Sequence, residues 1–391
     1  MSDLTRNTMK NRVAICAAAT TGFVAKNTAR SQTSLAAQAG IDAVRACGLT
    51  KNDIDGLCGS WPSAHELQSA LGLPRLTWSG NPMIPLVDHI ATAAAAVHAG
   101  LCETVLVYHA AYRAAWNTGS ALKDPFRRIA TPGLNDPKPG PETMAAAVGY
   151  AGWASRYLYE YGATREDFGI VALNARANAA RNPHAAMRAP LTMDDYLNAR
   201  MIREPLCLYD MDVAVDGADA FILTTAERAR DLALPPVLIH AAVLGQVAPN
   251  EEDQTAGLRA NGQQVVIDTL KAKSDFWIGD VDVYFPYDGF TPIALNWIEN
   301  AGWCKPGEGG AFLGDHWDAA AGRVLIDGRV AVNPHGGSLS EGATQASGHI
   351  REAVHQLQGL AGERQVPDAQ RALITAGGFF FNAQGLTLVA G

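Results

Sequence analysis

Cysteine pairs, positive charge and long apolar runs are all scarce in this 391-residue chain. Its six cysteines are scattered without a CxxC pair, which argues against a disulfide framework and a structural zinc site. The formal net charge is -8 and basic residues do not cluster, which argues against nucleic-acid binding. No apolar stretch approaches the ~18 residues of a membrane span, and the N-terminus lacks a signal peptide's apolar core. We therefore expect a cytoplasmic protein with no metal, nucleic-acid or membrane partner.

The composition is that of a large globular α/β protein, with 48% hydrophobic and 18% charged residues. Short apolar runs, such as 12–18 and 103–110, alternate with segments of helical spacing, such as 33–49 and 86–100. This alternation predicts buried strands separated by helices. The region 111–204 is rich in Arg, Ala, Pro and Asn, and we expect it to be a helical insertion.

The second half of the chain repeats the pattern of the first. Both "AVRACGLTKNDIDGLCGSW" at 43–61 and "VIDTLKAKSDFWIGDVDVYFPYDG" at 266–289 read as helix, turn, Asp-x-Asp and strand. A repeat of such length predicts an internally duplicated α/β fold rather than a solenoid. We place an N-terminal half at 1–235 and a C-terminal half at 236–391, divided at the paired prolines of "DLALPPV".

Three motifs carry a resemblance to a known family. They are "REPLCLYDMDVAVDGADAFILT" at 203–224, "YDGFTPIALNWIENAGWCKPGEGGAF" at 287–312 and "VNPHGGSLSEG" at 332–342. With them the chain resembles the thiolase superfamily over nearly its whole length. The last two resemble its lipid-transfer-protein branch, the sterol carrier protein thiolase-like proteins. The resemblance implies a five-layered α-β-α-β-α thiolase fold of duplicated halves with a homodimeric core.

Residues that a thiolase uses for catalysis are replaced at the matching positions of this chain. The nucleophilic cysteine position falls on Met83, and a loop position that carries Asn or His falls on Tyr287. The family's Gly-His-Pro reads Gly-Ala343-Thr344, and the position of the closing cysteine holds Thr375. A thioether cannot form the acyl thioester that thiolase chemistry requires. The replacements imply another reaction, or none.

One branch of the superfamily lacks the cysteine: the thiolase-like aldolases of steroid side-chain degradation, which this chain resembles in "YD.F" and "HGG.LSE". Such enzymes cleave a β-hydroxyacyl-CoA by a retro-aldol reaction into a ketone and a shorter acyl-CoA such as propionyl-CoA. A base takes the β-hydroxyl proton while oxyanion donors stabilise the enolate. The resemblance implies a carbon–carbon lyase that acts on a CoA thioester without a cofactor. It also implies a separate small OB-fold, zinc-ribbon acyl-CoA-binding partner, giving a heterotetramer.

Tyr287, followed by Asp288, is the leading acid–base candidate, and His335 beside the glycine pair is the alternative. Tyr287 could equally pack at a strand end, and His335 could equally hold loop carbonyls. Glu341 could orient His335 or cap the following helix, and we favour the cap. Members of the aldolase branch carry a second tyrosine where Ala343 stands here, so a two-tyrosine mechanism is not expected at these positions.

Two pairs of glycines are expected to let the thioester approach the backbone closely, with a tight turn as the alternative interpretation. The predicted substrate-binding residues are Gly336, Gly337, Glu341, Gly377, Gly378 and Met83. Arginines of the insertion are expected to meet the CoA phosphates, but the pattern does not single any of them out. His349, at the start of a helix, and the buried Asp88 and His89 are expected to be structural.

Two other functions stay open at this point. The chain could be a non-catalytic thiolase-like subunit of an acyltransferase complex. It could also be an acyltransferase with a displaced nucleophile, for which Cys58 or Cys102 would have to serve, although neither position fits.

Overall fold

The computed structural model describes residues 4–26, 28–82, 86–114, 145–247, 256–378 and 383–391. The predicted substrate-binding residue Met83 lies outside the described residues.

The first half of the described chain forms a sheet in the strand order β1, β7, β4, β2, β3. The first two neighbouring pairs in this order are antiparallel and the next two are parallel. The strands are β1 (Val13–Thr20), β7 (Asp216–Thr225), β4 (Thr104–Tyr112), β2 (Gly56–Cys58) and β3 (Trp78–Gly80).

The second half repeats this topology in the order β8, β14, β13, β9, β12, again with two antiparallel and then two parallel pairs. β1 also pairs with β8, through Ala14 and Leu238, which joins the two sheets at their edges. The predicted duplication is therefore confirmed, while the separation into units 1–235 and 236–391 stays a prediction. The strands are β8 (Val237–Gly245), β14 (Ala383–Ala390), β13 (Arg371–Ala376), β9 (Val283–Pro286), β12 (Val330–Val332), and the added β11 (Arg323–Ile326) and β10 (Trp317–Asp318).

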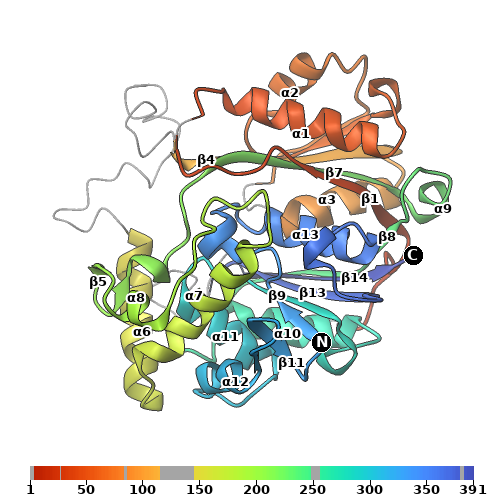
Figure 1. Ribbon diagram of the computed structural model, residues 1–391. Coiled ribbons are helices and arrows are strands. Elements are labelled where there is room, and N and C mark those ends of the chain that lie inside the picture. Colours follow the sequence, from red (N-terminus) through yellow and green to blue (C-terminus); the bar gives the residue numbers. More distant parts are fainter. Residues whose placement is uncertain (1–3, 27, 83–85, 115–144, 248–255, 379–382) are drawn as a thin grey trace.

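Figure 1 shows the helices in three layers around the two sheets. Helices α1 and α2 cover the outer face of the first sheet, α3 and α13 lie between the sheets, and α10, α11 and α12 cover the outer face of the second. The predicted α-β-α-β-α arrangement is confirmed. The helices are α1 (Gln32–Ala46), α2 (Ala64–Leu71), α3 (Val87–His98), α10 (Gly262–Lys273), α11 (Thr291–Ala301), α12 (Gly309–Asp315) and α13 (Ser347–Gln358).

The two central helices differ in what they bury. The sequence of α3, "VDHIATAAAAVH", is rich in alanine, so its small side chains let it pack closely between sheets. In contrast, α13 buries charged residues, among them Arg351 and Glu352, together with its apolar ones. Because a buried charge needs a partner, α13 indicates a polar cluster in the middle of the molecule.

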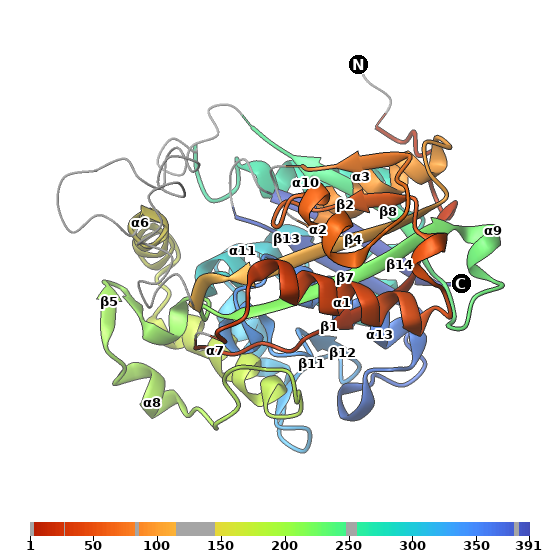
Figure 2. The same cartoon turned by 90° about the horizontal axis from the view of Figure 1, so that it is seen from above.

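The insertion lies to one side of the layers in both views (Figures 1 and 2). Its described part from residue 145 on is helical as expected, with the addition of a short two-stranded sheet in which Met201 pairs with Cys207. Asn174 of α7 donates a hydrogen bond of 3.0 Å to the carbonyl of Val332, so α7 is fastened to the end of β12. The elements are α6 (Ala145–Tyr161), α7 (Arg165–Ala179), α8 (Met193–Leu197), β5 (Met201–Arg203) and β6 (Leu206–Cys207); α9 (Ala226–Ala229) follows β7. No described helix has the length and apolar character needed to cross a membrane.

Candidate active site

The predicted site residues follow three neighbouring parallel strands at the same edge of the second sheet. Tyr287 comes directly after β9, the glycine loop of residues 333–342 follows β12, and Gly377 follows β13. The loops are hydrogen bonded: the Tyr287 amide donates to the carbonyl of Thr375 (2.9 Å), and the Asn333 side chain donates to that of Pro286 (2.8 Å). Carboxyl ends of parallel strands are where α/β proteins commonly place their binding sites.

Asp288 is fully buried and organises the glycine loop. Its carboxylate accepts hydrogen bonds from the backbone amides of Ser338 (2.7 Å) and Leu339 (3.3 Å). It also contacts Nε2 of His349 at 3.1 Å. Because a Cβ atom on Gly337 would lie 1.9 Å from the carboxylate, only glycine fits there. Asp288 is thus bound by the loop on several sides.

Gly336 has a φ of +106°, and a Cβ atom there would lie 2.6 Å from the Cβ of Ala179 in α7. The groups that approach the paired glycines in this structure are therefore α7 and Asp288. The role of Gly336 and Gly337 in binding a thioester stays a prediction.

His335 is fully buried and lies edge-on to His349, with ring centroids 4.6 Å apart. In the described part of the chain neither ring nitrogen of His335 has a hydrogen-bond partner. Burial, reinforced by His349 and Arg351, lowers the pKa of His335 well below its ordinary value. His335 is therefore an enclosed, neutral imidazole.

Glu341 is also fully buried, and Asn182 and Arg351 donate hydrogen bonds to its Oε1. Its other oxygen, Oε2, lies 3.9 Å from Nε2 of His335. Burial raises the pKa of Glu341 to about 7, although Arg351 opposes this shift. The expectation that Glu341 caps α13 is wrong: the Gly348 amide in the first turn of α13 donates to the Thr344 hydroxyl at 3.1 Å instead, and Glu341 belongs to a separate wide helical turn, Gly337–Glu341.

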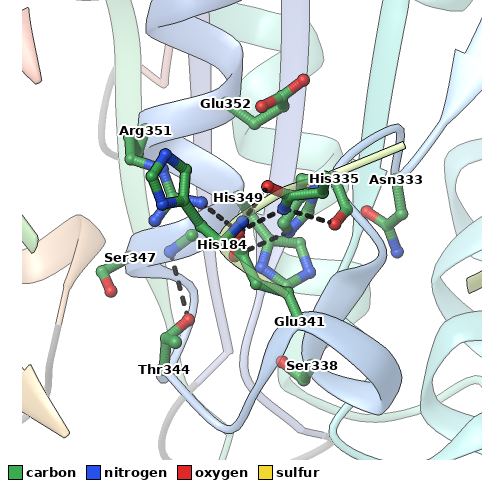
Figure 3. Close-up of polar contacts among 12 residues, drawn as sticks. His184, Asn333, His335, Ser338, Glu341, Thr344, Ser347, His349, Arg351 and Glu352 are labelled. Carbon is green, nitrogen blue, oxygen red and sulfur yellow. Dashed lines mark hydrogen bonds and ion pairs between the residues drawn. The ribbon is translucent and has the colours of Figure 1, made fainter. Parts of the chain in front are cut away.

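Arg351, which Figure 3 shows near Glu341, links the two sheets. It donates to Asp219 of β7 at 2.6 Å as well as to Glu341, and Ser347 donates to the same aspartate at 2.5 Å. A second pair, Arg364 with Glu352, lies beside it with nitrogen–oxygen distances of 2.9 to 3.1 Å. The charges of α13 are therefore paired, as burial requires.

Tyr287 is half-buried, in contrast to the fully buried histidines. Its ring lies against Gly289, whose carbonyl accepts from the Asp212 amide at 3.0 Å. The Asp212 carboxylate binds the exposed Arg113 at 2.9 Å. Burial and the Asp212 charge raise the pKa of Tyr287, while Arg113 opposes them. Tyr287 is therefore a neutral phenol at neutral pH, next to an ion pair.

The other loops of the predicted site are defined by single contacts. Gly377 has a φ of +78°, and its carbonyl accepts a 2.9 Å hydrogen bond from Trp297. The hydroxyl of Thr375 is buried 3.4 Å from that of Tyr284. Substrate binding by Gly377, Gly378 and Glu341 stays a prediction.

Sequence reasoning missed several residues that the structure brings into the site. His349, expected to be structural, is the partner of Asp288. Arg113, Asp212 and Asn182 also gave no local signal, because their partners lie far along the chain. Charged residues within the buried helix at "IREAVHQL" were the available sign of a buried polar cluster.

Asp88 and Nε2 of His89 have partners outside the candidate site, whereas Nδ1 of His89 is buried without a hydrogen-bond partner among the described residues. Asp88 accepts from Thr92 at 3.0 Å, and Nε2 of His89 contacts Ser60 at 2.8 Å and the Pro82 carbonyl at 3.2 Å. Several insertion arginines also bind backbone carbonyls, as Arg165 and Arg176 do. Among the described residues, no group of three or more His, Cys, Asp or Glu side chains could hold a metal ion.

Comparisons with known proteins agree with the observed fold and extend over the site. A family model described as thiolase C-terminal domain-like matches residues 264–390, which include the glycine loop. The chain is 33% identical to a 17-hydroxy-3-oxo-4-pregnene-20-carboxyl-CoA lyase of Mycobacterium tuberculosis, over 94% of this chain and 97% of that protein. It is 32% identical to a steroid side-chain-cleaving aldolase of Thermomonospora curvata, over 90% of this chain and 92% of that protein.

Solved structures give the same picture. A structure titled as an Ltp2-ChsH2(DUF35) aldolase superposes with a TM-score of 0.82 at 32% identity, covering 98% of this chain and 99% of that one. Human mitochondrial 3-ketoacyl-CoA thiolase superposes with a TM-score of 0.66 at 13% identity, covering 98% and 99%, and that likeness concerns the fold alone.

Proposed function

This chain belongs to the thiolase superfamily, in its lipid-transfer-protein branch with the thiolase-like steroid side-chain aldolases, and we propose that it cleaves a β-hydroxyacyl-CoA by a retro-aldol reaction. The substrate is a steroid side-chain CoA thioester with a tertiary β-hydroxyl group. The products are a steroid ketone and a shorter acyl-CoA such as propionyl-CoA.

The observation in the structure that carries the proposal is the half-buried phenol of Tyr287 at the carboxyl end of β9, among loops that carry no thiol in the described residues. Retro-aldol cleavage needs no covalent intermediate. It needs one group that moves the β-hydroxyl proton and donors that stabilise the enolate oxygen. Tyr287 serves as the proton-moving group, and the backbone amides of the glycine loops are the donors that fit the second requirement.

The state of the cysteines supports a reaction without a thiol nucleophile. Five of the six are buried, and Cys304 is partly exposed. Burial raises the pKa of Cys102 and of Cys304 to about 12, and that of Cys207 to about 11. Because the thiolate is the nucleophile, thiols with raised pKa values react poorly at neutral pH.

We also propose a partner for the reaction: a small OB-fold, zinc-ribbon protein that binds the acyl-CoA alongside this chain. The support is the structural neighbour whose title names an aldolase made of Ltp2 and a DUF35-containing ChsH2 chain. The core of the assembly is a homodimer of this chain, and two partner chains complete a heterotetramer in the cytoplasm.

The test is to mix the purified chain, with and without such a partner, with a steroid β-hydroxyacyl-CoA and to measure ketone and short acyl-CoA. In Tyr287→Phe, kcat should fall by ~10²–10⁴-fold, the usual contribution of general acid–base catalysis. The matched control is Tyr108→Phe, because Tyr108 is a buried tyrosine of β4 that donates only to the Pro62 carbonyl at 2.8 Å. Full activity of Tyr287→Phe would contradict the assignment, and no turnover with any partner would favour a non-catalytic subunit.

A further inference from the structure

The polar cluster behind Asp288 has more buried negative than positive charge. Arg364 and Glu352 form an ion pair, and their charges cancel. The other acidic side chains of the cluster in the described part of the chain are those of Asp219, Glu341 and Asp288, against the guanidinium of Arg351. Net charge is costly in a low-dielectric interior. Neutrality therefore requires two protons, and the carboxyl and imidazole groups of the cluster are where they can reside.

Figure 3 shows Glu341, His335 and His349 close together, and contacts from His349 extend toward Tyr287. Oε2 of Glu341 lies 3.9 Å from Nε2 of His335, and the His335 ring lies 4.6 Å from that of His349. Nε2 of His349 lies 3.1 Å from Oδ1 of Asp288, and the same oxygen accepts a hydrogen bond from the Ser338 amide. The His349 ring is 5.8 Å from that of Tyr287.

Unsatisfied atoms mark the same groups. In the described part of the chain, both ring nitrogens of His335, Nδ1 of His349, Oε2 of Glu341 and Oγ of Ser338 are buried without a hydrogen-bond partner. Buried polar groups are normally paired, so a cluster of orphans needs an explanation. These atoms are free to form the hydrogen bonds, direct or through a water molecule, along which a proton can move.

We propose that this cluster is a proton store, in which Glu341 and His335 hold a mobile proton that reaches Tyr287 through His349. The proposal rests on the retro-aldol function proposed above. In it Tyr287 touches the substrate, whereas Glu341, His335 and His349 act through Tyr287. The 3.9 Å step between Glu341 and His335 is longer than a hydrogen bond, so the proton crosses it through a water molecule or after the carboxyl group turns.

The store explains how a neutral phenol can act as the base. Tyr287 takes the β-hydroxyl proton while it passes its own proton inward, so no phenolate has to exist in the buried site. As the substrate O–H and C–C bonds break, the ketone C=O forms and the bonding electrons move into the thioester as an enolate. The stored proton then returns and forms the new C–H bond of the acyl-CoA. Substrate and products balance without another reactant.

The cluster can accept the proton of Tyr287 only when Glu341 is ionised. In that state the cluster has a net charge of one negative unit. Other groups around Glu341 and His335 set this equilibrium, and burial, opposed by Arg351, raises the pKa of Glu341 to about 7. The rate should therefore rise as the pH passes about 7. The charged and titratable groups that act on the pair directly are Arg351, Glu352 and His349 of α13, Asp219 of β7, and Arg364. Farther out, His355, His184 and His109 interact with these groups, and Asp288 contacts His349.

The test compares pH profiles of kcat in the partner complex for the unmodified chain, Glu341→Gln and Glu352→Gln. Glu352→Gln is the matched control, since Glu352, which lies in α13, is also a fully buried glutamate paired with an arginine. We expect the inflection near pH 7 to disappear in Glu341→Gln with a kcat loss of ~100-fold. In Glu352→Gln it should persist but move to lower pH, because the Glu352 charge helps to raise the pKa of Glu341. An inflection retained in Glu341→Gln overturns the proposal. If Glu341→Gln does not fold, His335→Phe must lose the same inflection, and its retention there overturns the proposal equally.

A second readout needs no turnover and separates this proposal from the proposed function. Infrared difference spectra of the protein without substrate should show a protonated carboxyl band that disappears as the pH passes about 7 and is missing in Glu341→Gln. If the carboxyl band is present but no substrate is cleaved, the lyase function is refuted, and Glu341 still titrates within a buried cluster. Cleavage without the band would refute the store and leave the lyase function standing.

Discussion

Nε2 of His349 lies 3.1 Å from Oδ1 of Asp288, and both side chains are fully buried. The contact joins the first turn of α13 to the residue after Tyr287. Because the same carboxylate accepts from the Ser338 amide at 2.7 Å, the glycine loop is held to both elements at once. Changes to this junction should therefore affect stability and the position of Tyr287 together.

Asp288→Asn should lower the free energy of unfolding by about 1–3 kcal/mol. At present Oδ2 of Asp288 accepts from the Leu339 amide at 3.3 Å. In an asparagine whose oxygen faces Ser338, the NH₂ group takes the place of Oδ2, so two hydrogen-bond donors face each other. Urea unfolding measures the change. The control is Asp275→Asn, whose side chain is 69% exposed in an ion pair with Lys10 and should matter little. Equal stability of the two variants would contradict the role of Asp288.

Gly337→Ala should be strongly destabilising, by about 2 kcal/mol or more, because its Cβ would overlap the Asp288 carboxylate at a φ of +60°. Gly314→Ala is the matched control: Gly314 lies in α12, and no atom approaches a Cβ there within 4 Å. That control should gain up to about 1 kcal/mol from helix propensity. Thermal unfolding of both variants measures the difference, and a Gly337→Ala variant as stable as the parent would refute the close packing.

Ala346→Gly should cost much less stability than the same change inside α13, although both alanines are fully buried. Ala346 has a φ of +75° at the residue before α13, and a side chain in the left-handed region costs about 1–2 kcal/mol. The greater freedom of glycine in the unfolded chain takes back about 0.4–1 kcal/mol. Deleting the buried methyl group costs about 0.8 kcal/mol more, so the net change should lie within about 1 kcal/mol of zero, measured by urea unfolding. The same change at Ala353, inside α13, relieves no strain and should cost about 1.5 kcal/mol or more, and an equal loss at Ala346 would contradict the strain.

Acid should act on stability through opposing groups. Burial lowers the pKa of His89 and of His109 to about 4. Between about pH 6.5 and pH 4 these two histidines are therefore protonated in the unfolded chain and neutral in the folded chain. The free energy of unfolding then falls as the pH drops from about 6.5 to 4. Glu341 acts oppositely: its folded pKa of about 7 lies above the unfolded value, so its contribution is complete below about pH 4.5 and is lost as the pH rises through 7.

Glu341→Gln should therefore lose more stability on acidification from pH 7.5 to 5 than the unmodified chain loses. The Glu341 contribution is at most about 3 kcal/mol over its whole window. Urea unfolding at several pH values measures it, with Glu352→Gln as the control for a broken buried pair. Parallel curves for Glu341→Gln and the unmodified chain would show that Glu341 does not titrate in this range.

The fold was readable from the sequence because strands and helices carry their own periodicity. The apolar run before Ala19 and the alanine-rich stretch after Leu86 each became the expected element, β1 and α3. The added strands β5 and β6 were not predicted, since each spans only two or three residues and offers no pattern.

The site was readable only in part. Tyr287, Asp288, His335 and Glu341 lie within two short motifs and come together as neighbouring strand ends do. His349 was interpreted as structural because its partnership with Asp288 depends on the loop folding back onto α13. The cap predicted for Glu341 failed for the same reason: positive φ angles from Gly342 to Ala346 turn the chain before the helix starts, which a sequence does not display.

The most direct test of the central claim is a product balance for the partner complex acting on a steroid β-hydroxyacyl-CoA, combined with the intact mass of this chain during turnover. The account predicts equal amounts of steroid ketone and short acyl-CoA, with no acyl group attached to the chain at any time. An acyl adduct on one of the six cysteines, or release of free CoA in place of the short acyl-CoA, would contradict it.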